Sequence, residues 1–234
     1  MSYPAADTAL LLFTRTSSSE AKAKNFLKIK SYKQNKKVAD KLIDHSLKTI
    51  RQTSLPHVII TEKEQVGFSF GEKLCNAIEG VFSKGFKKVI IIGNDCLQLR
   101  ADKIVEAAHK LCTHDMVMGA TGNGGVYLIG VTKQKFCKED FERISWQTSR
   151  VFTDLTAHAN YTNAYTHTLP KLDDISSYNE LINALKLLSI TDTVFQFISS
   201  IIASLCNVYQ KRPLFFHNNF LVGFGGLRGP PLVR

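Results

Sequence analysis

The sequence predicts an α/β protein with a mostly parallel central sheet. Three short apolar runs, which we expect to be strands, alternate with three segments whose apolar residues recur at helical spacing. The run at 88–93 is apolar almost without interruption, which is typical of a strand buried on both faces of a parallel sheet. Strands and helices that alternate in this way are joined by right-handed crossovers.

The first half of the chain is expected to alternate strands and helices three times. Each predicted strand is bounded by polar residues, Pro or Gly, and each predicted helix has apolar residues three or four positions apart. In chain order these are a strand at 8–13, a helix around 38–50, a strand at 57–61, a helix around 70–82, a strand at 88–93 and a helix around 104–112.

The second half is expected to add two strands and then helices. The apolar runs 116–118 and 126–131 flank a glycine-rich turn, so they predict two neighbouring strands. The helices predicted after them lie partly within 141–158, around 181–188 and at 194–206. From Lys211 onward the chain is rich in Gly and Pro, which predicts an irregular tail.

The length of 234 residues suits one domain of generous size. We expect an α/β domain over 1–190. Residues 191–234 are expected to supply a C-terminal helix and an irregular Gly/Pro-rich tail packed on the same domain.

The charge of the chain is strongly positive and local. Lys and Arg total 30 against 20 Asp and Glu, which gives a formal net charge of +10. Residues 20–51 hold ten Lys or Arg and three acidic residues, and 207–234 hold four and none. Such charge indicates an anionic partner or simply a solvated face. The basic stretch has only Phe26 and Tyr32 as aromatic residues, so the sequence does not favour a nucleic-acid partner.

Five widely spaced cysteines indicate a reducing compartment. They form neither a CxxC pair nor a Cys/His cluster, which argues against a disulfide framework and a zinc site. No export signal is recognisable near the first residue. The most hydrophobic late stretch, 194–205, spans about twelve residues, well below the ~20 that a membrane-spanning helix needs. We therefore expect a cytoplasmic protein without a transmembrane segment.

The sharpest candidate for chemistry is Asp95, which follows the predicted strand at 88–93. Ligands of open parallel sheets gather beyond the carboxyl ends of the strands. A carboxylate held there suits a Mg²⁺ or Mn²⁺ ion that bridges diphosphate oxygens. The alternative is an Asp that caps the helix near Ala101 or orders a turn.

Two further clusters are expected at the same edge. Arg15, Lys22 and Lys24 follow the first strand and would neutralise charge on a leaving diphosphate, unless they belong to a solvated loop. The segment 119–125 is rich in Gly but is followed by a strand, so it does not match the dinucleotide-binding fingerprint. It is either a hairpin turn or a place where the backbone approaches a sugar or phosphate closely.

Several motifs in a matching order resemble a known family. They are LLFTRT at 11–16 with AKAK at 21–24, GFSFGEK at 67–73, IGNDC at 92–96, GGVYLIG at 124–130, WQT at 146–148 and LPKLDDI at 169–175. Together they resemble the uncharacterised bacterial proteins of the glycosyltransferase-A type, or nucleotide-diphospho-sugar transferase-like proteins, over roughly residues 8–185. The resemblance implies a three-layer α/β/α, Rossmann-like fold related to nucleotidyltransferases that join a nucleoside triphosphate to a phosphorylated acceptor.

The resemblance also implies functions for individual residues. Asp95 matches the metal-binding Asp of the family's Gly-Ser/Thr-Asp motif, and Lys22 and Lys24 match basic positions of its first loop. Gly124 and Gly125 match the pair in its Asp-Gly-Gly motif. Asp174 matches the first Asp of its Asp-Ile-Asp motif.

The chain departs from the family pattern at several of these motifs. Ala21 stands for a Gly, Asn25-Phe26 for Thr-Arg, Leu97 for a Pro, Asn123 for an Asp and Ser176 for an Asp. Phe26 removes a bidentate phosphate donor. Asn123 and Ser176 remove two negative charges from the region expected to hold the metal, where a neutral Asn binds a divalent ion more weakly than a carboxylate.

Two main interpretations follow. The first is an enzyme, a nucleotide-diphospho-sugar transferase of glycosyltransferase or nucleotidyltransferase type that binds a nucleotide or nucleotide-sugar. Its predicted residues are Asp95 and Lys24 in catalysis, Asp95 as ligand of Mg²⁺ or Mn²⁺, Thr14, Arg15, Lys22, Lys24 and Asn94 as nucleotide or phosphate contacts, and Asn123, Gly124, Gly125 and Asp174 on the acceptor side.

The second interpretation is a catalytically degenerate member that binds a nucleotide, a sugar phosphate or a protein partner without turnover. A third is binding of a nucleic acid or an anionic surface through residues 22–51. The sequence leaves open the base, the sugar, the acceptor and the oligomeric state.

Overall fold

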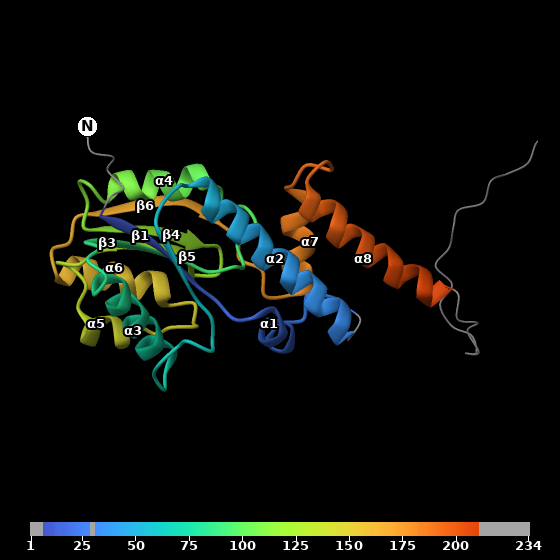
Figure 1. Ribbon diagram of the computed structural model, residues 1–234, viewed down its shortest axis with the longest axis horizontal. Coiled ribbons are helices and arrows are strands. Elements are labelled where there is room, and N and C mark those ends of the chain that lie inside the picture. Colours follow the sequence, from blue (N-terminus) through green and yellow to red (C-terminus); the bar gives the residue numbers. More distant parts are fainter. Residues whose placement is uncertain (1–6, 29–30, 211–234) are drawn as a thin grey trace, which may run out of the picture.

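A six-stranded sheet forms the centre of the protein in a computed structural model that describes residues 7–28 and 31–210 (Figure 1). The strands are β1 (Thr8–Phe13), β2 (His57–Ile60), β3 (Lys88–Ile92), β4 (Met116–Thr121), β5 (Val126–Thr132) and β6 (Thr166–Leu172). Their order across the sheet is β2-β1-β3-β5-β4-β6. Only β5 runs antiparallel to its neighbours, so the predicted mostly parallel sheet is confirmed.

Helices cover both faces of this sheet. They are α1 (Ser17–Ala23), α2 (Tyr32–Gln52), α3 (Phe70–Phe82), α4 (Ala101–Lys110), α5 (Lys138–Glu142), α6 (Val151–Tyr161), α7 (Tyr178–Lys186) and α8 (Thr193–Gln210). The end of α2 and α4 lie on one face, and α3, α5 and α6 lie on the other (Figure 1). The three layers predicted from the resemblance are therefore confirmed.

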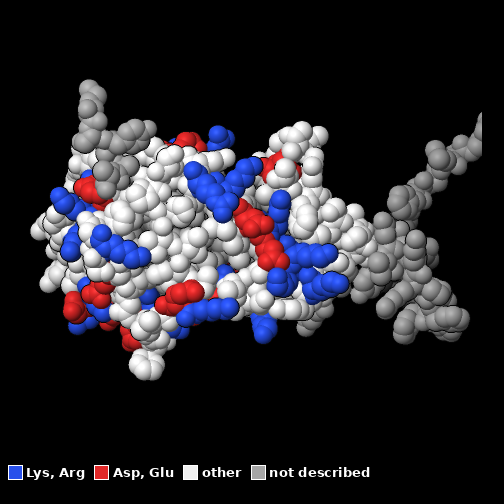
Figure 2. Space-filling view, viewed as in Figure 1, with Lys and Arg blue, Asp and Glu red and all other residues white. Residues whose placement is uncertain are grey.

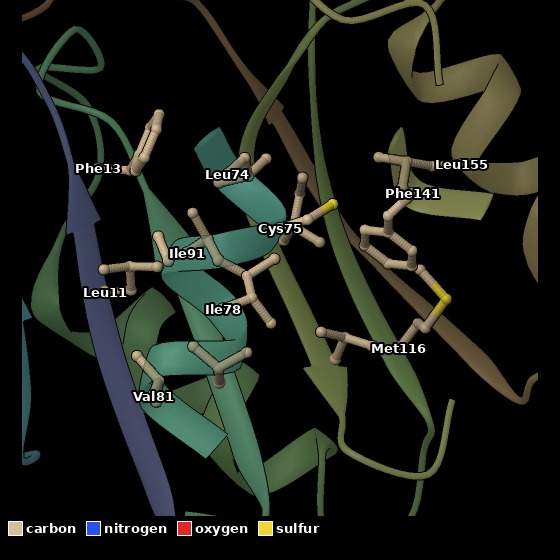
Figure 3. Packing of buried hydrophobic residues seen from close by; sticks show 14 of the residues in the cluster. Leu11, Phe13, Leu74, Cys75, Ile78, Val81, Ile91, Met116, Phe141 and Leu155 are labelled. Atoms are coloured by element: carbon tan, nitrogen blue, oxygen red, sulfur yellow. The ribbon is translucent and has the colours of Figure 1, made fainter. Parts of the chain in front are cut away.

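Alternate residues of each central strand pack into the two halves of the core. Leu11 and Ile91 face α3, where they meet Ile78 (Figure 3). Leu10 and Leu12 point to the opposite face and pack toward α4. Burial on both faces explains why these strands read as continuous apolar runs, since each fully buried aliphatic side chain contributes about 1.5–3 kcal/mol.

A third apolar cluster joins α1, α2, α7 and α8 beside the sheet. Phe26, Leu42 and Leu181 are buried in it, together with Ile198 of α8. The helix predicted at 194–206 is therefore present as α8, and it packs against α2. The division at residue 190 stays a prediction, and the tail predicted from Lys211 onward lies outside the described residues.

Two elements differ from the sequence prediction. Strand β6 was not predicted because Pro170 and Lys171 interrupt its apolar pattern, but β6 lies at the edge of the sheet, where Pro is tolerated. Helix α1 has seven residues and no apolar stripe. It begins at the N-cap Thr16, whose side chain accepts a hydrogen bond from the Ser19 amide.

The basic stretch of the sequence forms the outer face of α2. Figure 2 shows Lys and Arg side chains gathered over this helix, with acidic side chains between them. Lys36 pairs with Asp40 one turn later at 2.9 Å, as expected of a solvated helix face. In the described part of the chain, no helix is long and apolar enough to span a bilayer.

Candidate functional site

A cavity of about 840 Å³ opens at the edge of the sheet beyond the ends of β1 and β3. The turn between β4 and β5 and the segment after β6 complete its wall. Most of the predicted site residues line this cavity, namely Thr14, Arg15, Lys24, Asn94, Asp95, Asn123, Gly125 and Asp174. Five separate segments of sequence therefore converge on one place, as the carboxyl edge of a parallel sheet requires.

Asp95 lies in this cavity and is not a helix cap. The N-cap of α4 is Arg100, and no side chain caps that helix, so the alternative of an Asp that caps the helix near Ala101 is wrong. The Asp95 side chain is about one-third exposed. Its backbone carbonyl accepts a hydrogen bond from the Ile175 amide at 2.8 Å, which ties the end of β3 to the segment after β6.

Lys24 is the partner of Asp95. Its Nζ lies 3.0 Å from Asp95 Oδ2 and 2.8 Å from Oε1 of Glu20, and donates to the Ile175 carbonyl at 3.2 Å. Burial alone would lower the pKa of Lys24, but the charges of Asp95 and Glu20 outweigh it, so the pKa lies above its ordinary value. The ammonium group thus donates to Asp95 and to the Ile175 carbonyl and is ion-paired with Glu20.

Thr14 and Asn94 form a buried polar pair at the ends of β1 and β3. The Thr14 hydroxyl donates to Asn94 Oδ1 at 2.8 Å. The Asn94 Nδ2 group is buried and has no hydrogen-bond partner among the described residues. A buried amide donor without a partner is costly, so this group is suited to an acceptor supplied by a ligand or water.

The glycine-rich turn holds Asp174 through Asn123. The Asn123 amide donates from Nδ2 to Asp174 Oδ1 at 3.0 Å, while its Oδ1 accepts from the Thr121 hydroxyl and the Gly125 amide. Burial, together with the nearby charge of Asp95, raises the pKa of Asp174 above its ordinary value. The two carboxylates therefore share one region of the cavity and repel each other.

Two predicted residues lie outside the cavity lining. Lys22 is exposed in the last turn of α1. Gly124 has φ of +87°, and a Cβ there would come within 2.1 Å of the Ser149 carbonyl oxygen. The glycine is thus required for close packing of the turn against the segment before α6, rather than for approach to a ligand.

Sequence reasoning missed several residues that line the cavity. Glu62 accepts hydrogen bonds from the Thr16 amide at 2.5 Å and from the hydroxyls of Thr16 and Ser19. Burial raises the pKa of Glu62, but these hydrogen bonds outweigh it and lower the pKa to about 2. Gln65 adds a bond to the Thr14 carbonyl at 2.9 Å. No local pattern at 61–65 signals this attachment, because its partners lie more than forty residues away.

Lys73 and Trp146 also line the cavity. Both belong to motifs that carry the family resemblance, and this membership is the sequence signal that could have identified them as site residues. Trp146 Nε1 donates to the Phe141 carbonyl at 2.7 Å, and its ring centroid lies 5.8 Å from that of Phe70. These contacts fix the indole in the wall of the cavity.

The carboxylates of the cavity fit a divalent cation that is held partly by its ligand. Mg²⁺ is commonly bound through one or two carboxylates together with substrate phosphates, and Asp95 and Asp174 supply such a pair. Within residues 7–28 and 31–210, no group of three or more His, Cys, Asp or Glu could hold a metal ion. The described side chains alone therefore do not enclose a metal.

A family model described as an uncharacterized protein conserved in bacteria (DUF2064) matches residues 42–148. The chain resembles this family. The resemblance predicted from the motifs is confirmed over that range, which contains Asp95 and the glycine-rich turn. No curated protein matches the sequence.

Solved structures share the fold. A candidate nucleotide-diphospho-sugar transferase from Desulfovibrio desulfuricans G20 is 17% identical, with a TM-score of 0.71 over 85% of this chain and 97% of that one. A hypothetical transferase from Thermus thermophilus is 12% identical, with a TM-score of 0.49 over 74% and 98%. Rv0371c from Mycobacterium tuberculosis H37Rv, in complex with manganese, is 8% identical, with a TM-score of 0.48 over 78% and 99%. The first of these confirms the predicted nucleotide-diphospho-sugar transferase fold, and the fold alone.

Proposed function

We propose that the protein is a metal-assisted transferase that acts at a diphosphate, of glycosyltransferase or nucleotidyltransferase type. The observation that carries the proposal is the meeting of Asp95, Asp174, Lys24 and Arg15 in one cavity at the carboxyl edge of the sheet. The fold shared with the transferase from D. desulfuricans supports the same class of ligand.

Different side chains of the proposed site would bind the metal, the phosphates and the acceptor. Asp95 and Asp174 would hold Mg²⁺ or Mn²⁺, which when bound would supply positive charge against the diphosphate. Lys24 and Arg15 would turn from Glu20 and Asp95 toward phosphate oxygens and neutralise charge that develops on the leaving group. The Asn94 amide would donate to an oxygen of the nucleotide, and the turn at Asn123 and Gly125 would shape the acceptor side.

A balance of charge supports the requirement for a metal. The cavity is lined by three cationic side chains, Arg15, Lys24 and Lys73, and by four carboxylates, Glu20, Glu62, Asp95 and Asp174. A diphosphate would add further negative charge to a lining that already has an excess of it. A divalent cation compensates this excess.

The second candidate is a degenerate member that binds a nucleotide, sugar phosphate or protein partner without turnover. It is favoured by the ion pair of Lys24 with Asp95, which already neutralises the expected metal ligand. Phe26, at the position of the family's Arg, is fully buried in the helical cluster and cannot contact a phosphate. Asn123 has its carbonyl oxygen occupied by two donors.

A thermal-shift panel of nucleoside di- and triphosphates and nucleotide-sugars separates the two candidates. The transferase is expected to be stabilised by a nucleotide only with Mg²⁺ or Mn²⁺ present, and Asp95→Asn is expected to abolish that metal-dependent part. Asp44→Asn, which removes an exposed carboxylate of α2, serves as the matched control. Stabilisation without metal supports the degenerate binder, and no shift with any nucleotide contradicts the transferase.

We also propose a reducing, cytoplasmic setting. Cys75 and Cys96 are buried thiols without a disulfide, and burial raises the pKa of each to about 12. Thiols of this kind are poor nucleophiles and need no oxidising compartment. Fractionation of cells that express the chain tests this proposal, and recovery outside the cytoplasm contradicts it.

A further inference from the structure

The cations of the cavity differ in whether the protein already neutralises them. Arg15 Nη1 lies 3.4 Å from Glu20 Oε2, and Lys24 is engaged by Glu20, Asp95 and the Ile175 carbonyl. Lys73 projects from the first turns of α3 into the same cavity. Its ammonium group has neither an ion pair nor a hydrogen bond among the described residues, so it is the cavity cation that is available to an anion.

The other donors near the end of β1 are occupied too. The Thr16 amide and the hydroxyls of Thr16 and Ser19 all donate to the carboxylate of Glu62. An anion that approached this loop would have to displace a carboxylate. An anion that approached Lys73 would displace only water, which favours Lys73 as the first contact.

Two aromatic side chains line the same cavity as Lys73. Phe68 is 99% exposed at the edge of the cavity, and its backbone is nevertheless held in place. The Phe68 amide donates to Glu72 Oε2 at 2.7 Å, and the Val66 carbonyl accepts from Asn76 Nδ2 at 2.8 Å. Trp146, which lines the same cavity, is fixed by its hydrogen bond to the Phe141 carbonyl. A fully exposed phenylalanine on a restrained backbone is a ready surface for a ring.

We propose that Lys73, Phe68 and Trp146 form a subsite for an anionic group carried on a ring. Lys73 binds the anion, a phosphate or a carboxylate, and the aromatic side chains contact the face of the ring, whether sugar or aromatic. The subsite rests on the proposed function in one respect: the anionic group and its ring are assigned to the second substrate of the proposed transferase. Asp95 and Asp174 follow β3 and β6, whereas Lys73 and Phe68 belong to α3 and the loop before it, so these carboxylates are left to the diphosphate.

The single tryptophan of the chain gives a direct readout, because Trp146 lines the subsite. Its fluorescence is titrated in EDTA, without nucleotide, with phenyl phosphate, glucose 1-phosphate and inorganic phosphate. Lys73→Met is expected to weaken binding of phenyl phosphate and glucose 1-phosphate about tenfold or more. Lys73→Arg is expected to restore most of the affinity, and Lys84→Met, at an exposed position near the other end of α3, is expected to leave it unchanged.

Phe68→Ala separates the ring from the charge. It is expected to weaken the binding of phenyl phosphate severalfold and to leave the affinity for inorganic phosphate unchanged, since only phenyl phosphate has a ring that contacts Phe68. Tighter binding of glucose 1-phosphate than of phenyl phosphate identifies the ring as a sugar, and the reverse identifies it as aromatic.

Two results overturn the subsite. One is Lys73→Met binding the ring-bearing anions as tightly as the unaltered protein, and the other is no change in Trp146 fluorescence with any of the three probes at millimolar concentration. Asp95→Asn distinguishes this failure from failure of the proposed function, because it is expected to abolish metal-dependent nucleotide binding without weakening the ring-bearing anions in EDTA.

Discussion

The surroundings of Asp95 and of Lys73, which line one cavity, are built in different ways. Around Asp95, every cation is matched by a carboxylate and the ion pairs are partly or wholly buried, with Glu20 only 2% exposed. Around Lys73, the ammonium group is unmatched among the described residues and Phe68 faces solvent. The group around Asp95 is therefore integral to the fold, whereas Lys73 and Phe68 contribute little to it.

This difference between the two sets of residues predicts different effects on the stability of the fold and on ligand binding. Buried charges are tolerated only when they are paired, so the Glu20–Lys24–Asp95 group constrains the loops after β1 and β3 even without a ligand. An exposed ring and an unpaired surface cation impose no such constraint. Substitutions of Glu20, Lys24 or Asp95 are expected to alter both stability and binding, and substitutions of Lys73 or Phe68 to alter binding alone.

The largest effect is expected from Glu20→Gln. The change removes the carboxylate that pairs with Arg15 and one of the two that pair with the largely buried Lys24. The free energy of unfolding should therefore fall by about 3 kcal/mol. Urea denaturation measures this loss. Asp102→Asn breaks an exposed pair with Arg100 and should cost less than about 1 kcal/mol. Equal losses in the two variants would contradict the structural role assigned to Glu20.

A smaller, pH-dependent effect is expected from Glu62→Gln. Because the pKa of Glu62 is lowered from 4.5 to about 2 in the folded protein, its contribution to stability is present above pH 4.5 and is lost as the pH falls toward 2. The contribution should be about 1 kcal/mol, since the side chain is partly exposed and solvent screens its charge. The difference in unfolding free energy between the two proteins, measured from pH 7 to 2.5, should shrink below pH 4.5. A difference that does not vary with pH would contradict the assignment.

The smallest effect on stability is expected from Phe68→Ala. The ring is almost wholly exposed, so its removal should change the free energy of unfolding by less than about 0.5 kcal/mol. Phe70→Ala is the matched comparison, because that ring packs against Phe13 and Trp146 and its loss should cost at least about 1 kcal/mol. If Phe68→Ala destabilises as much as Phe70→Ala, the exposed ring belongs to the fold and the contrast fails.

Prediction from sequence succeeded where the signal is local. The apolar runs of β1 and β3 predicted the strands of the central sheet. The position of Asp95 directly after β3 predicted that this side chain lies at the edge of the sheet. Strand β6 was missed because Pro170 interrupts it and its place at the sheet edge is a property of the whole fold.

The site was predictable in part for the same reason. Thr14 and Asn94 follow neighbouring parallel strands, and this topology brings their side chains together at the sheet edge. The link between Glu62 and Thr16 depends on how the β2–α3 loop folds over the end of β1, and the pairing of Lys24 with Glu20 and Asp95 depends on burial. No spacing in the sequence encodes either contact.

The central claim is that Asp95 and a divalent cation together receive a nucleotide diphosphate in this cavity. The most direct test is the dissociation constant of the best-binding nucleotide, measured by Trp146 fluorescence with Mg²⁺ and with EDTA, in the unaltered protein and in Asp95→Asn. We expect Mg²⁺ to tighten binding at least tenfold in the unaltered protein and to have no effect in the variant. Equal affinity with and without Mg²⁺ in the unaltered protein would contradict the claim.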